Sequence, residues 1–501
     1  MYITASDLYN YVKCPHLIWR DKYGPQGEKI RETNPFVDLL WQRGIQHEEE
    51  VVNKIGQFID LHVGTLEERF ERTVKEMKKG TPLLYQGVIM HDNLLGIPDL
   101  LKKISENIYV PIDIKSGMGF EGSDEDDVDE GKPKKHYALQ LCLYVEILKN
   151  LGFAKENNGK IIDISGKEVD YLLDTAQGSK TPESWWGLYQ SVKKDVKALL
   201  ENQQQNKPAL SGICKLCCWC NSCKKWCRKE SDLTNIFYLG RSRRDVISKD
   251  IKIEKMEQLK ELNIATILAS KKLDKSFLRG IGEELLKKYI NRAEIITKTK
   301  KPVVYKKIEL PKVPTELFFD IEDDPTQDFI YLHGVYKREK GKGEFIPFLA
   351  KEFARESEKE AWNMFWTYIN SLPLNSYAVY YYSSHEKTAY KHLRERYPDI
   401  ITQEELEGFF ANPNVIDLYS KIILKYTDWP LSSYSIKDIA TLLGFKWRDE
   451  TPSGALSIQW YNEYLKTSDG DILKRILEYN EDDCKAMMVL KDEIESLSNR
   501  L

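Results

Sequence analysis

The chain has 501 residues, of which 42% are hydrophobic and 30% are charged, and its formal net charge is −4. This length allows about two to four domains, and the apolar content excludes a chain that is disordered throughout. No apolar run is long enough to span a membrane, and the first residues carry no basic, apolar leader, so we expect a cytoplasmic protein. The small net charge does not exclude nucleic-acid binding, because basic runs such as 224–229 and 298–307 are averaged out in it.

The N-terminal part of the chain mixes helices with short strands. Residues 36–58 repeat apolar side chains at three- and four-residue spacing, which predicts an amphipathic helix interrupted near Gly44. Residues 83–115 then form strand-like runs separated by polar turns, and residues 136–150 predict another helix. The acidic run 121–130 between them is too polar to pack and predicts a solvated loop. We assign residues 1–230 to a first α/β domain.

The strand VPIDIKSG (110–117) places a carboxylate and an ammonium on one face. Alternation puts Asp113 and Lys115 on the side opposite to the two isoleucines. A carboxylate there can bind Mg²⁺ or Mn²⁺, and a lysine about 7 Å along the strand can position water or offset the charge of a phosphate. Asp99, at the end of the preceding strand, and His47, on the earlier helix, complete a candidate ligand set. By itself, D-x-K also fits ordinary alternating charges on an exposed strand.

The order of these residues carries more information than the tripeptide. His47, Asp99, Asp113-x-Lys115 and then Gln140-x3-Tyr144 resemble the RecB-family PD-(D/E)XK nucleases in order and spacing. The resemblance implies a restriction-endonuclease-like fold for this domain. It assigns metal binding to His47, Asp99 and Asp113, catalysis to Asp99, Asp113 and Lys115, and DNA contact to Gln140 and Tyr144, which share a helix face.

Six of the nine cysteines lie within CKLCCWCNSCKKWC (214–227), which indicates a metal or cluster site in a reducing compartment. One assignment follows the local ferredoxin spacing C-x2-C-x2-C-x3-C, although Arg228 stands where that motif has proline. It would use Cys217, Cys220, Cys223 and Cys227.

The other assignment uses the spacing C-x2-C-x5-C. RecB-family nucleases with an iron–sulfur cluster have such a trio after the nuclease core and a lone N-terminal cysteine as fourth ligand. The resemblance therefore implies a 4Fe-4S cluster on Cys14, Cys214, Cys217 and Cys223, which we prefer. Zinc held by four thiolates remains the alternative. Either group would join positions about 200 residues apart and is expected to be structural.

Residues 231–310 are expected to form a helical, DNA-binding middle region that ends in a linker. The segment LRGIGEELLKKYINRAEI (278–295) places Gly280 and Gly282 directly before a helix, where backbone N–H groups can bind a phosphate. This pattern resembles a helix-hairpin-helix, an element that binds DNA without sequence preference. A turn that only joins two packed helices is the alternative. The basic, proline-flanked run 298–314 predicts the linker.

Residues 311–501 predict a second α/β domain, with strands and helices in alternation. The strand ELFFDIEDDP directs Asp320 and Glu322 to one face. Much later, LEYNEDDC places Tyr479 and Asp483 one helical turn apart. The predicted strands are 316–322, 328–336, 376–382 and 414–418, and the predicted helices are 357–372, 386–397 and a last one from 471.

D-x-E on an opening strand, followed by Y-x3-D, resembles the DnaQ-like exonucleases of the ribonuclease H-like fold. The resemblance implies that Asp320, Glu322 and Asp483 bind two Mg²⁺ or Mn²⁺ ions and that Tyr479 orients the attacking water. A further carboxylate from the part of the chain between these two motifs, here called the middle carboxylate, is also needed. The family commonly has asparagine and a later Phe-Asp there, whereas this chain offers Glu386 in YYYSSHEKTAY or Asp417 in NVIDLY.

Together, the two resemblances describe predicted RecB-family nucleases that carry a C-terminal ribonuclease H-like domain. They imply a metal-dependent DNA nuclease, an exonuclease on single strands or DNA ends, in repair or end processing. The sequence has no Walker A motif, so a helicase would be a separate partner. The alternatives are a spacer-trimming nuclease of the CRISPR adaptation type, and a nucleic-acid-binding scaffold whose inactive C-terminal domain docks a helicase.

Overall fold

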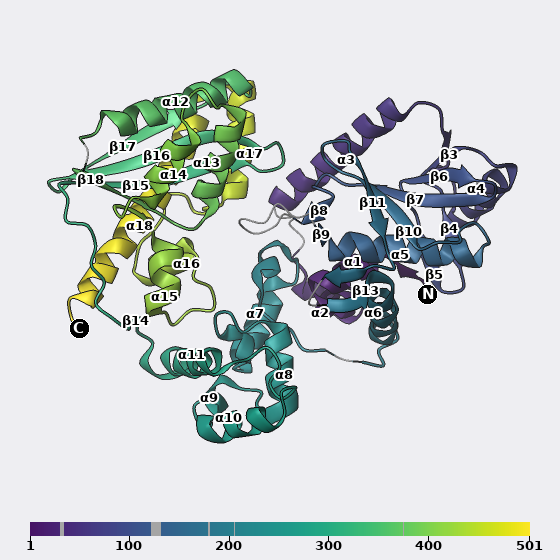
Figure 1. Ribbon diagram of the computed structural model, residues 1–501, viewed down its shortest axis with the longest axis horizontal. Coiled ribbons are helices and arrows are strands. Elements are labelled where there is room, and N and C mark those ends of the chain that lie inside the picture. The colour runs from purple at the N-terminus through teal and green to yellow at the C-terminus, as the bar shows by residue number, and fades with distance from the viewer. Residues whose placement is uncertain (31–34, 122–131, 179–180, 205, 374) are drawn as a thin grey trace. The chain divides into compact units, whose positions relative to one another are not determined.

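The computed structural model describes residues 1–30, 35–121, 132–178, 181–204, 206–373 and 375–501, so nearly all of the predicted acidic loop lies outside the described residues. The chain forms two compact units, each with its own sheet and core (Figure 1). The first unit comprises Met1–Pro208 and Gly212–Lys224, and the second comprises Ala209–Ser211 and Lys225–Leu501. No helix in the described part of the chain is both long and apolar enough to cross a bilayer.

The first unit is built on a six-stranded sheet with the strand order β11-β10-β7-β6-β3-β2. The hairpin partners β6 and β7 are antiparallel, whereas β10 lies parallel to β7. Helix α5 makes the crossover between these parallel strands and packs on both of them. Its sequence is apolar around most of its circumference, so it is buried along nearly its whole length. The elements are β2 (Ile59–Asp60), β3 (Leu83–Tyr85), β6 (Leu100–Ser105), β7 (Ile108–Ile114), α5 (Lys135–Asn150), β10 (Asn158–Ile162) and β11 (Glu168–Leu172).

Further helices and short strands complete the first unit. The helix predicted to be interrupted near Gly44 is continuous, because one glycine costs only about 1 kcal/mol within a strongly amphipathic helix. The helices are α1 (Ala5–Lys13), α2 (Pro15–Tyr23), α3 (Pro35–Ile55), α4 (Leu66–Lys79) and α6 (Trp185–Leu200). The short strands are β1 (Ile3–Thr4), β4 (Ile89–His91), β5 (Leu94–Gly96), β8 (Phe120–Glu121), β9 (Lys132–Pro133), β12 (Ala176–Gly178) and β13 (Thr181–Ser184).

Most of the region 231–310, which was expected to be helical, forms helices. Helices α8 to α11 share a hydrophobic core of their own within the second unit. The run predicted as a linker is not detached: β14 (Val303–Val304) pairs with β20 (Thr427–Asp428), and Ile308 and Leu310 pack against the C-terminal core. The helices are α7 (Cys220–Lys229), which contains the boundary between the units, α8 (Arg241–Ile251), α9 (Met256–Leu259), α10 (Ile264–Leu273) and α11 (Glu283–Glu294).

The C-terminal part of the second unit is a five-stranded sheet with the order β17-β16-β15-β18-β19. β17, β16 and β15 pair with one another in antiparallel order. β18 pairs parallel with β15, and β19 pairs parallel with β18. The strands are β15 (Thr315–Asp324), β16 (Phe329–Glu339), β17 (Lys342–Leu349), β18 (Tyr377–Tyr381) and β19 (Val415–Asp417). The helices are α12 (Arg355–Ser371), α13 (His385–Arg396), α14 (Gln403–Ala411), α15 (Leu424–Tyr426), α16 (Ile436–Leu442), α17 (Gly454–Thr467) and α18 (Gly470–Ser498).

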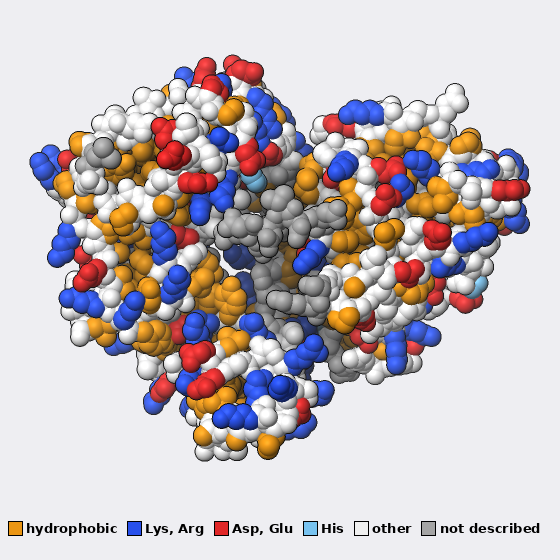
Figure 2. Space-filling model, in the orientation of Figure 1, with side chains coloured by type: hydrophobic (Ala, Val, Ile, Leu, Met, Phe, Trp, Pro, Cys, Tyr) orange, Lys and Arg blue, Asp and Glu red, His pale blue; other side chains and the backbone are white. Residues whose placement is uncertain are grey.

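Helices cover both faces of this sheet and bury a separate core on each. One core joins β15 with α12, α13 and α14, and the other joins it with α16 and α18. Alternation along the strand places Phe319 in the first core and Phe318 in the second, as the sequence predicts. Asp320 and Glu322 therefore face α18. Lysine, arginine and acidic side chains are mixed over the visible surface, in keeping with the small net charge (Figure 2).

Candidate functional site

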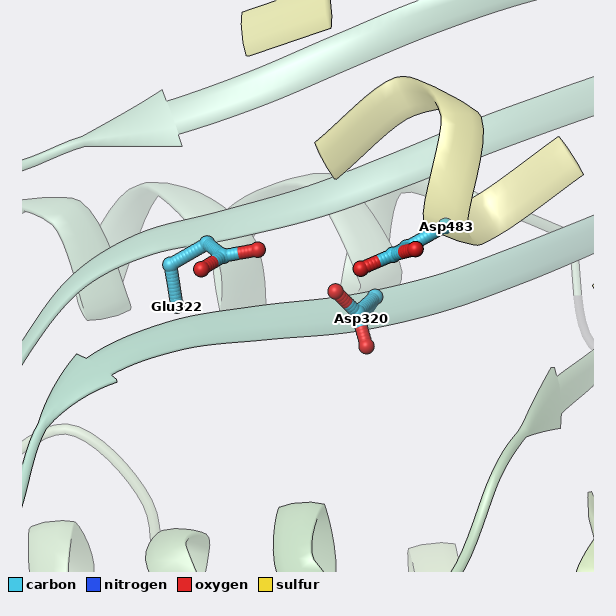
Figure 3. Close-up of side chains that lie close together, drawn as sticks. All are labelled: Asp320, Glu322 and Asp483. Atoms are coloured by element: carbon cyan, nitrogen blue, oxygen red, sulfur yellow. The ribbon is translucent and has the colours of Figure 1, made fainter. Parts of the chain in front are cut away.

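Three carboxylates converge where β15 passes beneath α18. Asp320 and Glu322 project from the strand, and Asp483 projects from the helix toward them (Figure 3). Each contributes an oxygen to a group whose members all lie within 4.8 Å of one another. Within the described residues, this is the only such group of three or more His, Cys, Asp or Glu ligand atoms. The predicted D-x-E and Y-x3-D segments thus meet in space.

Neighbouring donors orient each of these carboxylates. The side-chain amide of Asn480 donates to Asp320 Oδ2 at 2.8 Å and to Glu322 Oε1 at 3.4 Å. The indole N–H of Trp447 donates to Asp483 Oδ1 at 2.7 Å. Such fixed partners hold candidate ligands in one orientation before a metal ion binds.

Tyr479 lies one helical turn before Asp483, and burial, followed by the charge of Asp483, raises the pKa of its hydroxyl. The same hydroxyl accepts a hydrogen bond from Lys437 Nζ at 2.5 Å. Neither Lys437 nor Asn480 was predicted from the sequence. Asn480 had a local signal, because it follows Tyr479 and lies three residues before Asp483. Lys437 had none, because its segment reaches the site only through tertiary packing.

Burial makes the ionised forms of the three carboxylates unfavourable. Burial and repulsion from Asp483 raise the pKa of Glu322 to about 8. The pKa of Asp320 is also raised, first by burial and then by repulsion from Asp483 and Glu322, and burial raises the pKa of Asp483. A bound divalent cation favours the ionised forms and removes this penalty. This donor set therefore fits Mg²⁺ or Mn²⁺, which prefer oxygen ligands.

The two candidates for the middle carboxylate have different surroundings. Glu386, at the start of α13, is 3% exposed, and its Oε2 makes no hydrogen bond to any described residue. Burial raises its pKa to about 8, and its charge acts on Asp320. Asp417 instead accepts hydrogen bonds from the backbone N–H groups of Ser383 at 3.1 Å and Ser420 at 2.9 Å. Glu386 lies outside the group defined by 4.8 Å contacts, so its role as the middle carboxylate remains a prediction.

In the first unit, the predicted constellation gathers around β7. Lys115 Nζ lies 2.8 Å from Asp113 Oδ2, and burial, followed by the charge of Asp113, raises the pKa of Tyr144 on α5. Asp99 Oδ2 accepts a hydrogen bond from the backbone N–H of Ile114 at 2.7 Å. Burial, followed by repulsion from Asp113, raises the pKa of Asp99 to about 8. Although burial opposes it, the charges of Asp113 and Asp99 raise the pKa of Lys115.

The other residues predicted for this constellation have their own contacts. His47 Nε2 lies 3.1 Å from the backbone oxygen of Asp163. Gln140 is buried on α5, and its Oε1 makes no hydrogen bond within the described residues. Glu48, which follows His47, was not predicted from the sequence. It accepts a hydrogen bond at 2.9 Å from Gln86, whose side chain also donates to Asp99. The roles assigned to these residues remain predictions.

The N-terminal helices pack against the cysteine segment of the first unit. Arg20 donates to Ser222 at 2.8 Å, and the indole of Trp219 donates to Asp21 at 2.9 Å. Cys14 is the N-cap residue of α2, and its thiol interacts electrostatically with those of Cys217 and Cys223. Burial raises the pKa of Cys217 to about 12 and that of Cys223 to about 11, so a metal or cluster would have to displace their protons.

The spacing of the cysteine sulfurs bears on which group they can hold. No three of them, all within the described residues, lie within 4.8 Å of one another. Four thiolates around one zinc ion are about 3.8 Å apart, as Zn–S bonds of about 2.3 Å require. The sulfur positions therefore support neither zinc nor an iron–sulfur cluster. Both cysteine assignments remain predictions. Phosphate binding by Gly280 and Gly282 also remains a prediction, and a β-carbon added at either glycine would meet nothing within 4 Å.

Comparison with known proteins identifies part of the second unit. Residues 317–495 match the family model of the RNase H superfamily. No curated protein matches the chain. The matched span contains the converging carboxylates Asp320, Glu322 and Asp483, together with Tyr479. The chain therefore has a C-terminal RNase H-like domain with an acidic triad suited to metal binding, which indicates a metal-dependent nuclease.

Proposed function

We propose that this chain is a metal-dependent deoxyribonuclease whose RNase H-like domain removes nucleotides from single strands or DNA ends. The convergence of Asp320, Glu322 and Asp483 carries the proposal. Mg²⁺ or Mn²⁺ held there would activate water and stabilise the negative charge that develops on the phosphate. Tyr479 is placed to orient the water, and Glu386 to supply the fourth carboxylate.

A second nuclease site in the first unit is part of the proposal. Asp99 directly precedes β6, Asp113 lies on the adjacent strand β7, Lys115 directly follows β7, and α5 adds Tyr144. A buried carboxylate pair beside a lysine is suited to bind one divalent ion and to contact a phosphate. This arrangement supports a PD-(D/E)XK-type nuclease site of the RecB family.

For the cysteines, we propose a structural 4Fe-4S cluster on Cys14, Cys214, Cys217 and Cys223. The packing of the N-terminal helices, of which α2 begins directly after Cys14, against the cysteine segment supports it. The biological setting that we propose is DNA repair or end processing in the cytoplasm. A helicase partner, and a helix-hairpin-helix contact through Gly280 and Gly282, belong to the same proposal.

The experiment uses the full chain, Mn²⁺, and single- and double-stranded DNA and RNA labelled at either end. Asp320→Asn and Asp113→Asn are compared with Glu404→Gln, which changes an exposed carboxylate. We expect each site variant to remove one cutting activity, by about 100-fold or more, and Glu404→Gln to keep both. Cutting of RNA alone would refute the DNA specificity. Full activity in Asp320→Asn would refute the RNase H-like active site.

A further inference from the structure

The carboxylate site of the RNase H-like domain contains a lysine that neither acidic motif includes. Lys437 lies in the first turn of α16, a helix capped by Ser435. Its Nζ donates to the hydroxyl of Tyr479 at 2.5 Å and to the backbone oxygen of Pro452 at 3.3 Å. It also lies 4.7 Å from the centroid of the Tyr479 ring. These contacts from two segments hold the ammonium beside Tyr479.

The charge of Lys437 reaches all three carboxylates of the triad. Burial raises the pKa values of Asp320, Glu322 and Asp483, and the positive charge of Lys437 reduces this rise for all three. Both of these hydrogen-bond acceptors are neutral oxygens, so neither of them offsets the positive charge of the ammonium. Part of the negative charge that would attract metal ions is therefore already balanced by the protein.

We propose that Lys437 replaces the second divalent ion of this site, because it supplies a fixed positive charge that leaves the carboxylates with high affinity for only one Mg²⁺ or Mn²⁺. The inference rests on the proposed function, because it requires the triad to bind metal. Two-metal sites place their ions about 4 Å apart, where an added positive charge strongly opposes the second ion. Burial strengthens this opposition, because water screens it less.

Lys437 is also a positioning residue for Tyr479. A tyrosine hydroxyl has one donor and two acceptor sites. Here the hydroxyl accepts a hydrogen bond from Lys437, which leaves its O–H group and one lone pair for other partners such as water. The lysine thus restricts the rotation of the hydroxyl and the positions in which it can hold a water molecule.

A Mn²⁺ titration of the full chain, with unbound Mn²⁺ measured by electron paramagnetic resonance, tests the proposal. All proteins carry Asp113→Asn, which removes the contribution of the first unit. We expect Lys437→Met to bind one Mn²⁺ ion more than the parent, with the second ion bound about tenfold tighter or better. Lys437→Arg, which keeps the charge, and Lys446→Met, which removes an exposed lysine nearby, should match the parent.

The outcomes separate this inference from the function on which it rests. If Asp320→Asn binds as many Mn²⁺ ions as the parent, the triad does not hold metal and the proposed function fails. If Asp320→Asn loses an ion but Lys437→Met leaves stoichiometry and affinity unchanged, only the inference about Lys437 is overturned. Thermal unfolding in EDTA identifies a variant that fails to fold, in which case Lys437→Gln, which keeps a polar side chain without charge, replaces Lys437→Met.

A second readout tests the positioning role. If Lys437 acts through Tyr479, adding Lys437→Met to Tyr479→Phe should not lower the rate of cutting at saturating Mn²⁺ any further. The Mn²⁺ dependence of that rate should become cooperative in Lys437→Met, because a second ion then takes part. Fully additive effects of the two substitutions, with an unchanged Mn²⁺ dependence, would overturn the proposal.

Discussion

Gly334 on β16 and Asn480 on α18 are packed so closely that no side chain fits between them. A β-carbon added at Gly334 would lie 1.6 Å from Asn480 Oδ1. The other end of the same amide donates to Asp320 and Glu322. The glycine thus lets the helix approach the sheet closely enough for one amide to hold two carboxylates.

Gly334→Ala should therefore disturb both the fold and metal binding. The new methyl group must displace Asn480, which we expect to lower the free energy of unfolding by about 1–3 kcal/mol. Urea denaturation measures that change, and Mn²⁺ titration should show weaker binding, because Asp320 and Glu322 lose their common donor. Gly408→Ala is the matched control: Gly408 lies in α14, where a β-carbon would meet nothing within 4 Å. If the two variants are equally stable, the close contact has no energetic role.

The stability of the metal-free protein should fall as the pH rises from about 4 to about 8. The pKa values of Glu322 and Glu386 are raised to about 8 by burial, and those of Asp320 and Asp483 are also raised. The folded state therefore holds protons that the unfolded state has already lost, and stability declines until these groups ionise in the folded state. Urea midpoints measured in EDTA across this range test the trend.

Two changes should flatten this pH dependence. Mn²⁺ stabilises the ionised carboxylates, and Asp320→Asn removes one titrating group together with its repulsion of the others. Glu404→Gln, at an exposed position, should leave the slope unchanged. An identical slope in Asp320→Asn and the parent protein would show that the buried carboxylates do not cause the decline.

Replacing the two candidate middle carboxylates should give opposite results. Glu386→Gln should abolish cutting by the RNase H-like domain and leave stability in EDTA equal or higher, because Glu386 is buried without a hydrogen bond to its Oε2 from any described residue. Asp417→Asn should retain cutting but lower the free energy of unfolding by about 1 kcal/mol, because Asp417 Oδ1 accepts hydrogen bonds from two backbone N–H groups and an amide oxygen is a weaker acceptor than a carboxylate oxygen. Activity assays and urea denaturation on both variants distinguish the roles, and the reverse pattern would assign catalysis to Asp417.

Cysteine variants should distinguish the two ligand assignments. Cys214→Ala and Cys14→Ala should lose iron and visible absorbance after anaerobic purification, whereas Cys220→Ala and Cys227→Ala should keep them. Iron analysis and absorbance spectra measure the outcome. Loss of the cluster in Cys220→Ala but not in Cys14→Ala would favour the ferredoxin-type assignment. Stoichiometric zinc in colourless protein would overturn both.

Local sequence patterns predicted the C-terminal sheet well, because the side chains of its central strands alternate clearly between the two faces. The strands predicted at 316–322 and 376–382 correspond to β15 and β18, and the helix predicted from 471 corresponds to α18. The strand β17 was missed. It lies at the edge of the sheet and is mostly exposed in its first half, so its sequence lacks the alternation that burial imposes on a central strand.

The candidate site was predictable only where spacing within one element determines proximity. Asp320 and Glu322 share a strand face, and Tyr479 and Asp483 share a helix face, so each pair could be read from the sequence. Lys437 and Trp447 lie on other segments, and only tertiary packing brings them to the site. No regular spacing of residues in the sequence predicts that packing.

The contact between Asn480 and Asp320 joins segments 160 residues apart, which has a consequence for folding kinetics. Closing such a long loop is slow compared with the formation of local hairpins and helices. An intermediate in which β15 and β16 have paired but α18 has not docked would contain Asp320 and Glu322 without Asp483. Recovery of metal binding during refolding would then mark the final docking step, and would lag behind the recovery of secondary structure.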